Sequence, residues 1–71
     1  MSHKTARIVV NGKAQQLTQP SSVADLLVAL GWKSTQVVVE RNGYVVPRSD
    51  VGLVMLEEGD QVEIILPVAG G

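Results

Sequence analysis

The sequence contains no cysteine, no phenylalanine and a single histidine, and each scarcity excludes a class of function. Without cysteine the chain cannot form a disulfide, a thiolate metal site, an iron–sulfur cluster or a cysteine nucleophile. The one histidine, His3, lies in a polar N-terminal stretch and cannot supply a two-histidine metal site. We therefore expect no bound metal and no bound cofactor.

Charge of one sign and long apolar runs are scarce as well. Six basic and 7 acidic residues give a formal net charge of −1, and aromatic residues make up 3% of the chain. This leaves neither a basic field for a phosphate backbone nor a platform for stacking bases. No apolar run approaches the ~20 residues of a membrane-spanning helix, and the N-terminus lacks the apolar core of a signal peptide. We expect no nucleic-acid partner, no membrane partner and a cytoplasmic location.

The length of the chain limits its organisation. Its 71 residues leave room for one hydrophobic core, and 45% hydrophobic with 18% charged residues is typical of a globular domain. We expect a single domain over residues 1–71 that is monomeric when free. Residues 1–5 are expected to be a disordered leader and residues 67–71 a flexible tail, because neither segment offers apolar side chains that fit the core periodicity.

Two Asn-Gly pairs predict the turns of two β-hairpins. Both Asn11-Gly12 and Asn42-Gly43 lie between segments that have the composition of strands. Asn-Gly favours the positive φ angles that two-residue hairpin turns require. The five predicted strands cover residues 7–10, 13–17, 37–41, 44–46 and 61–66.

One helix is predicted over residues 23–30. Ser22 is placed as its N-cap, and Asp25 follows three residues later in the capping-box position. Apolar side chains recur at the spacing of one helix face. Gly31 supplies the left-handed C-terminal stop, and Trp32 after it can fold back onto the helix.

The order strand, strand, helix, strand, short strand, strand predicts an α+β roll. It would consist of a mixed four- to five-stranded sheet with the helix on one face. If the last strand lies parallel beside the first, the two most apolar strands occupy the centre of the sheet. That arrangement is the β-grasp, the architecture of ubiquitin. Residues 49–56 are expected to form a loop with one turn of helix.

The C-terminal residues carry the chemistry that the rest of the chain lacks. The carboxylates lie at the helix start or in turns, where capping and solvation explain them, so we expect no enzyme. A glycine carboxylate has no neighbouring Cβ and can enter a narrow channel, where it can attack the α-phosphate of a nucleotide. Proline would stiffen the exit from the last strand. The predicted reactive tail is Pro67, Val68, Ala69, Gly70 and Gly71.

From residue 7 to residue 71 the chain resembles the ubiquitin-like sulfur carriers of thiamine biosynthesis, the ThiS family. The resemblance implies that an ATP-dependent adenylating enzyme similar to ThiF activates Gly71. Sulfur supplied indirectly by a cysteine desulfurase would then replace AMP to give a thiocarboxylate. A thiazole synthase similar to ThiG would take that sulfur. The segments that carry the resemblance are residues 8–12, 23–27, 39–43, 45–49, 58–64 and 69–71.

Other functions stay open for the same sequence. The tail also resembles that of the molybdopterin-synthase small subunit (the MoaD type), a sister carrier, although the short length and Val46-Pro47-Arg48 favour the thiamine type. Another sulfur carrier or a ubiquitin-like protein modifier would use the same tail. A β-grasp interaction module would carry the two glycines incidentally.

Three residues are candidates for contacting a partner protein. Val9 and Ile65 are predicted to be neighbours on the uncovered face of the sheet, where adjacent exposed aliphatic side chains often mark a docking site. Arg48 is expected either to form a surface ion pair with Asp50 or to contact the partner.

Overall fold

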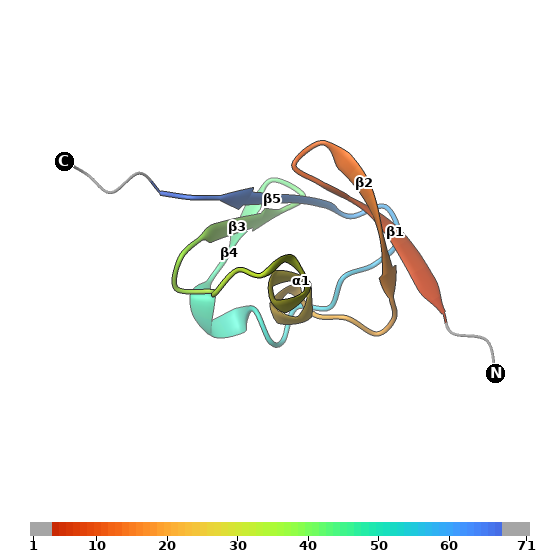
Figure 1. Cartoon of the computed structure of the whole chain (residues 1–71), viewed down its shortest axis with the longest axis horizontal. Helices are drawn as coiled ribbons and strands as arrows, with labels where there is room; N and C mark the ends of the chain where they lie inside the picture. The colour runs from red at the N-terminus through yellow and green to blue at the C-terminus, as the bar shows by residue number, and fades with distance from the viewer. Residues whose placement is uncertain (1–3, 68–71) are drawn as a thin grey trace.

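The computed structural model describes residues 4–67, which form strands and helices in the predicted order (Figure 1). Residues 4–67 contain one α-helix, of 8 residues. None of the helices in this range could span a membrane. The elements are β1 (Thr5–Val10), β2 (Lys13–Thr18), α1 (Val23–Leu30), β3 (Val38–Arg41), β4 (Tyr44–Val46), the 3₁₀ helix η1 (Arg48–Asp50) and β5 (Gln61–Ile65).

The first hairpin begins earlier than the sequence predicted. Thr5 pairs with Thr18 in the antiparallel β1–β2 ladder, and the Gln19 N–H donates to the Lys4 carbonyl at 2.7 Å. The expected disordered leader is therefore wrong for Thr5, because backbone pairing holds this residue without any apolar side chain. Lys4, also part of the expected leader, accepts the hydrogen bond from Gln19, and residues 1–3 lie outside the described residues.

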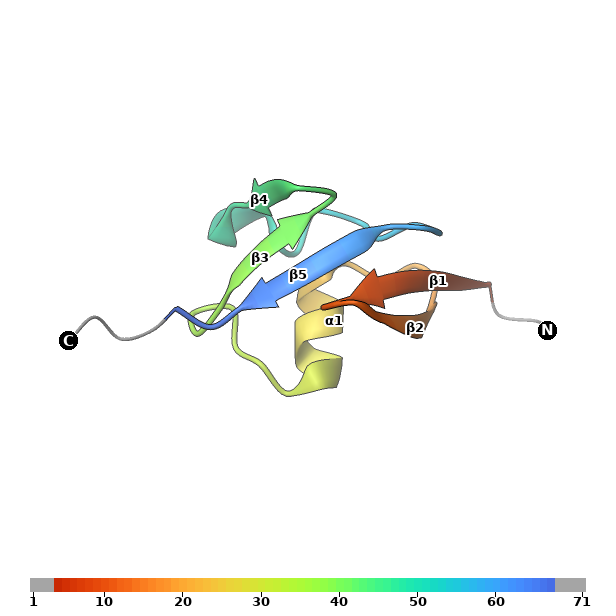
Figure 2. The same cartoon turned by 90° about the horizontal axis from the view of Figure 1, so that it is seen from above.

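The five strands form one mixed sheet in the order β2-β1-β5-β3-β4 (Figure 2). The last strand, β5, lies between β1, to which it is parallel, and β3, to which it is antiparallel. This confirms the pairing of the first and last strands. With α1 packed on one face of the sheet, the fold is the predicted α+β roll of the β-grasp type.

The ends of α1 are fixed by the residues that the sequence indicated. The Ser22 hydroxyl accepts from the Asp25 N–H at 3.1 Å, and the Asp25 carboxylate accepts from the Ser22 N–H at 2.9 Å. The Ser22 N–H first, and then the Ser22 side chain, stabilise the ionised Asp25 carboxylate and lower its pKa. Gly31 has a φ of 82°, and the Trp32 N–H donates to the Leu27 carbonyl at 2.9 Å. The capping box and the C-terminal stop are both confirmed.

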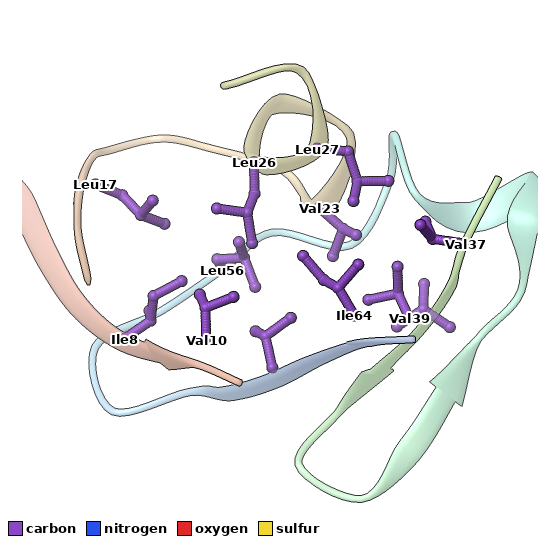
Figure 3. Packing of buried hydrophobic residues seen from close by; sticks show 12 residues of the cluster. Ile8, Val10, Leu17, Val23, Leu26, Leu27, Val37, Val39, Leu56 and Ile64 are labelled. Carbon is purple, nitrogen blue, oxygen red and sulfur yellow. The ribbon is translucent and has the colours of Figure 1, made fainter. Parts of the chain in front are cut away.

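The core lies between α1 and one face of the sheet (Figure 3). Alternate strand side chains point toward the helix, as the two-residue period of a strand requires. Leu26 and Leu27 of α1 meet them and are almost completely buried. The opposite, uncovered face of the sheet carries the side chains between these positions. The strand residues on the core side are Ala6, Ile8, Val10, Leu17, Val39, Val46, Val62 and Ile64.

Two residues of α1 provide a test of this packing. Leu26→Ala is expected to lower the free energy of unfolding by about 2–5 kcal/mol, because it leaves a cavity in the core. Val28 is 78% exposed, so Val28→Ala should change the free energy by no more than about 0.5 kcal/mol. Denaturant unfolding of both variants measures the difference, and equal losses would contradict the position of α1.

Candidate functional site: the end of β5 and the uncovered sheet face

The predicted reactive tail continues from the end of β5. We call the end of this strand, together with Leu66 and Pro67, the stem of the tail. β1 ends at Val10, which pairs with Val62, so the last residues of β5 extend beyond the end of β1. Leu66 follows the strand and is 54% exposed, and Pro67 after it is exposed. The predicted tail residues Val68, Ala69, Gly70 and Gly71 lie outside the described residues. The structure therefore describes the element that would present them.

β5 is held at its start by the turn that joins β3 to β4. The Asn42 N–H donates to the Gln61 carbonyl at 2.7 Å, and the Asn42 side-chain oxygen accepts from the Gln61 N–H at 2.8 Å. The amide nitrogen of the same side chain donates to Asp60 Oδ1 at 3.1 Å. The asparagine of the first turn, Asn11, binds near the other end of β5, at Ile64.

Asp60 is the buried charge of this region, with 7% of its surface exposed. It accepts hydrogen bonds from the Glu57 N–H at 2.8 Å and from Arg41 Nε at 2.9 Å. Burial raises the pKa of Asp60. The hydrogen bonds from Glu57, Asn42 and Arg41, with the positive charge of Arg41, outweigh burial and hold the pKa below its usual value. The carboxylate thus fixes the turn at which β5 begins.

The uncovered face beside the stem combines apolar and acidic side chains. Ile65, which is 40% exposed, pairs with Val38 of β3. The next pair on this face is Glu40 with Glu63, and Val45 of β4 lies opposite Glu40. Register across three strands brings these five side chains together. We call them the docking face.

The predicted contact between Val9 and Ile65 is wrong. Val9 pairs with Gln61, and Ile65 lies four residues farther along β5, a distance of about 13 Å at the rise of a strand. Both side chains lie on the uncovered face, but Ile65 belongs to the docking face and Val9 does not. The sequence could not give this separation because it depends on the register of a parallel pair.

Glu40 and Glu63 are two like charges in directly opposite positions of an antiparallel pair, an arrangement that destabilises a sheet. Within residues 4–67 the ion pairs join Arg41 to Asp60 and to Glu57, and neither Glu40 nor Glu63 takes part. Within residues 4–67 the two carboxylates of the docking face are thus not neutralised by an ion pair. Sequence reasoning missed both residues, because only the strand register shows that they are opposite each other.

Arg48 borders the docking face but does not form the ion pair expected with Asp50. Its Nε donates to the Ser34 carbonyl at 3.0 Å, because the η1 turn directs the side chain toward the loop after α1. It lines a groove of about 240 Å³ together with Val38 and Val45. Val38 lies beside both Arg48 and Ile65, so two of the three predicted contact residues border one surface.

Within residues 4–67, no three or more histidine, aspartate or glutamate side chains are grouped so that they could hold a metal ion. The same range has no buried side-chain nitrogen or oxygen without a hydrogen-bond partner.

Comparisons with known proteins agree with the fold and extend over the tail. The family model of the ThiS family matches residues 7–71. The crystal structure of the thiamine biosynthesis protein ThiS from Geobacter metallireducens has a TM-score of 0.80 and 32% identity, covering 92% of this chain and 99% of that one. The β-grasp fold is thus that of a ThiS protein, and the chain belongs to the ThiS family.

Two curated relatives differ in how much of their length is matched. The thiazole synthase of Paramagnetospirillum magneticum is 37% identical over 65 residues, which are 92% of this chain and 20% of that protein. The chain thus spans about a fifth of the length of this relative. The uncharacterized protein ycf40 of Pyropia yezoensis is 32% identical over 71 residues, which are all of both chains.

The buried carboxylate gives a pH-dependent prediction. The pKa of Asp60 is lowered in the folded state, so the ionised carboxylate stabilises the fold above its unfolded pKa of about 3.9. This stabilisation is lost as the pH falls through the folded pKa. Asp60→Asn should lower the free energy of unfolding at pH 7 by about 1.5–3 kcal/mol and should reduce the loss on acidification. Denaturant unfolding at a series of pH values measures both effects.

Glu57→Gln is the matched control for this substitution. The Glu57 side chain is 75% exposed and lies 3.9 Å from the same arginine, Arg41. Its removal should cost less than about 1 kcal/mol. An Asp60→Asn variant with the pH profile of wild type would show that the buried carboxylate does not stabilise the turn.

Proposed function

We propose that this chain is the sulfur carrier of thiazole formation in thiamine biosynthesis, acting in the cytoplasm as a substrate of other enzymes. The observation that carries the proposal is the match to the ThiS family, which runs from β1 through the two terminal glycines, residues 7–71. The similarity to the thiamine biosynthesis protein of Geobacter metallireducens supports the same pathway.

The geometry of the described residues suits a carrier. β5 is central in the sheet and hydrogen-bonded on both sides, so the stem leaves the domain from a rigid element. Pro67 restricts the backbone at the point of exit. In this proposal the tail after Pro67 enters the active site of a partner enzyme. The β-grasp domain stays outside and provides the surface that the partner binds.

The proposed chemistry takes place at the carboxylate of Gly71 in two balanced steps. A carboxylate oxygen attacks the α-phosphorus of ATP, and pyrophosphate leaves from an acyl-adenylate. The sulfur reaches this step as hydrosulfide, which a thiol reductant releases from the persulfide of a cysteine desulfurase. The hydrosulfide then attacks the carbonyl carbon and loses its proton. The carbon–oxygen bond to AMP breaks, and the sulfur remains as a thiocarboxylate. Two glycines at the end of the chain let the backbone pass a narrow channel.

Two partners follow from this cycle. The first is an adenylating enzyme of the ThiF type, which we propose to dock on the docking face through apolar and basic side chains. The second is a thiazole synthase, the acceptor of the sulfur. The relative named thiazole synthase, in which a segment similar to this chain forms part of the protein, supports that pairing.

The central test is the intact mass of the protein. After incubation with ATP, a ThiF-type adenylating enzyme and sulfide, wild type should gain the mass difference between one sulfur and one oxygen atom. Transfer to a thiazole synthase should then restore the original mass. No mass change in wild type with a proven cognate adenylating enzyme, ATP and a sulfur donor would refute the carrier function.

Variants of the tail separate this function from the alternatives. A chain extended by one residue displaces the carboxylate by up to about 3.5 Å, and displacement of a reacting group by even about 1 Å can cost about 100-fold in rate. Gly71→Ala should also be impaired, because its Cβ narrows the path of the tail. Transfer of sulfur to the large subunit of molybdopterin synthase would indicate the sister carrier. Linkage of Gly71 to protein lysines would indicate a modifier.

The docking face gives a second test, in which binding and stability change in opposite directions. Glu63→Gln should weaken binding to the adenylating enzyme. It should also raise the free energy of unfolding by about 0.2–1 kcal/mol, because it removes the repulsion from Glu40. Ile65→Asp should weaken binding further. Titration calorimetry and denaturant unfolding measure the two quantities.

Val28→Asp is the control for the docking face. Val28 is 78% exposed on α1, which covers the opposite face of the sheet. Its substitution adds the same charge as Ile65→Asp and should leave the affinity for the adenylating enzyme unchanged. Equal weakening by both variants would mean that charge alone, rather than the docking face, determines binding.

A further inference from the structure

The end of β5 lacks a neighbouring strand on one side. β1 pairs with β5 only through Val9 and Val10, and the Asn11 N–H makes one more bond, to the Val62 carbonyl at 2.9 Å. At Asn11 the chain turns away into β2 with a φ of 50°. The backbone N–H and carbonyl of Ile64 therefore face a position where β1 has no further strand residue.

The side chain of Asn11 occupies that position. Its Oδ1 accepts from the Ile64 N–H at 2.8 Å, and its Nδ2 donates to the Ile64 carbonyl at 3.2 Å. The amide thus makes one donor and one acceptor bond with a single residue, as the facing residue of an antiparallel hydrogen-bonded pair does. Asparagine suits this position because it tolerates a positive φ and carries both a donor and an acceptor. Aspartate would offer no donor, and glycine would offer neither group.

This contact lies close to the stem. Ile64 precedes Leu66 by two residues and Pro67 by three, and Ile65 between them is held on the other side by its pairing with Val38. Within residues 4–67, no hydrogen bond on the β1 side of β5 lies nearer to the tail than those of Asn11. Without the amide, β5 would be anchored at its end on the β3 side alone.

We propose that Asn11 is a positioning residue for the reactive tail. Its amide replaces the missing strand residue and fixes the direction in which β5 delivers Leu66 and Pro67 to the adenylating enzyme. This inference rests on the proposed carrier function. Because errors of about 1 Å at a reacting group can cost about 100-fold in rate, a change in the exit direction should slow adenylation without removing the docking face.

The second Asn-Gly turn provides a matched control. Asn42 also has a positive φ, of 53°, and its side chain binds the same strand at the opposite end, through Gln61 and Asp60. Asn11→Gly and Asn42→Gly both give Gly-Gly turns that keep the required φ angles. Each removes two side-chain hydrogen bonds, but only the first removes them beside the stem.

The experiment compares the two variants in adenylation kinetics and in backbone dynamics. Asn11→Gly should lower kcat for adenylation by at least about tenfold with KM within about twofold of wild type. The ¹⁵N order parameters of Ile65 and Leu66 should fall in the same variant. Asn42→Gly should keep kcat within about twofold and leave those order parameters unchanged. Asn11→Asp, which keeps an acceptor for the Ile64 N–H, should lie between Asn11→Gly and wild type.

Equal effects of the two glycine variants on kcat, or wild-type kinetics of Asn11→Gly, would overturn the positioning role. A loss of stability by itself would appear in both variants and would not reproduce the contrast. If the adenylating enzyme does not act on wild type, the carrier function fails. The order parameters then test independently whether Asn11 fixes the end of β5. Values for Ile65 and Leu66 that do not differ between the two variants would overturn that role.

Discussion

The position of β5 between β1 and β3 is the constraint on which the rest of the structure depends. Hydrogen bonds on both sides fix the pleat of this strand, and the pleat places Val62 and Ile64 against α1 and leaves Glu63 and Ile65 on the opposite face. One strand thereby defines the core, the docking face and the direction of the stem. Because β5 is the last strand and its partners come from both halves of the described chain, the fold closes only when these distant segments meet.

The two Asn-Gly turns contribute to this constraint in two ways. Their backbone conformation lets the hairpins close, since both asparagines have positive φ angles. Their side-chain amides then bind the two ends of β5, Asn42 at Gln61 and Asn11 at Ile64. Local turn chemistry and long-range strand pairing are thus coupled through the same two residues. The buried Asp60 strengthens the first of these contacts by binding Asn42 and Arg41 together.

The docking face shows which side-chain contacts could be predicted from the sequence and which could not. Ile65 was identified because it alternates with the apolar core residues of its own strand. Glu40, Val38 and Val45 lie on other strands, and only the β3–β5 and β3–β4 registers bring them beside it. Val9 was placed next to Ile65 on the correct face but at the wrong distance, because pairing of two strands does not specify their offset. Arg48 was expected either to pair with Asp50 or to contact a partner, and in the structure its Nε donates to the Ser34 carbonyl.

The sequence by itself determined the local elements of this protein: both Asn-Gly turns, the capping box of α1, its glycine stop and the alternation of each strand. These features depend on residues a few positions apart, whose conformational preferences act without the rest of the chain. The resemblance of the segments over residues 7–71 also indicated the family. Only the tertiary structure decided which side chains share the uncovered face, why Thr5 is part of β1, and what the amides of Asn11 and Asn42 bind. The contacts of the two amides join residues 18 to 53 positions apart. Their partners, like those on the uncovered face, are set by strand register rather than by local preference.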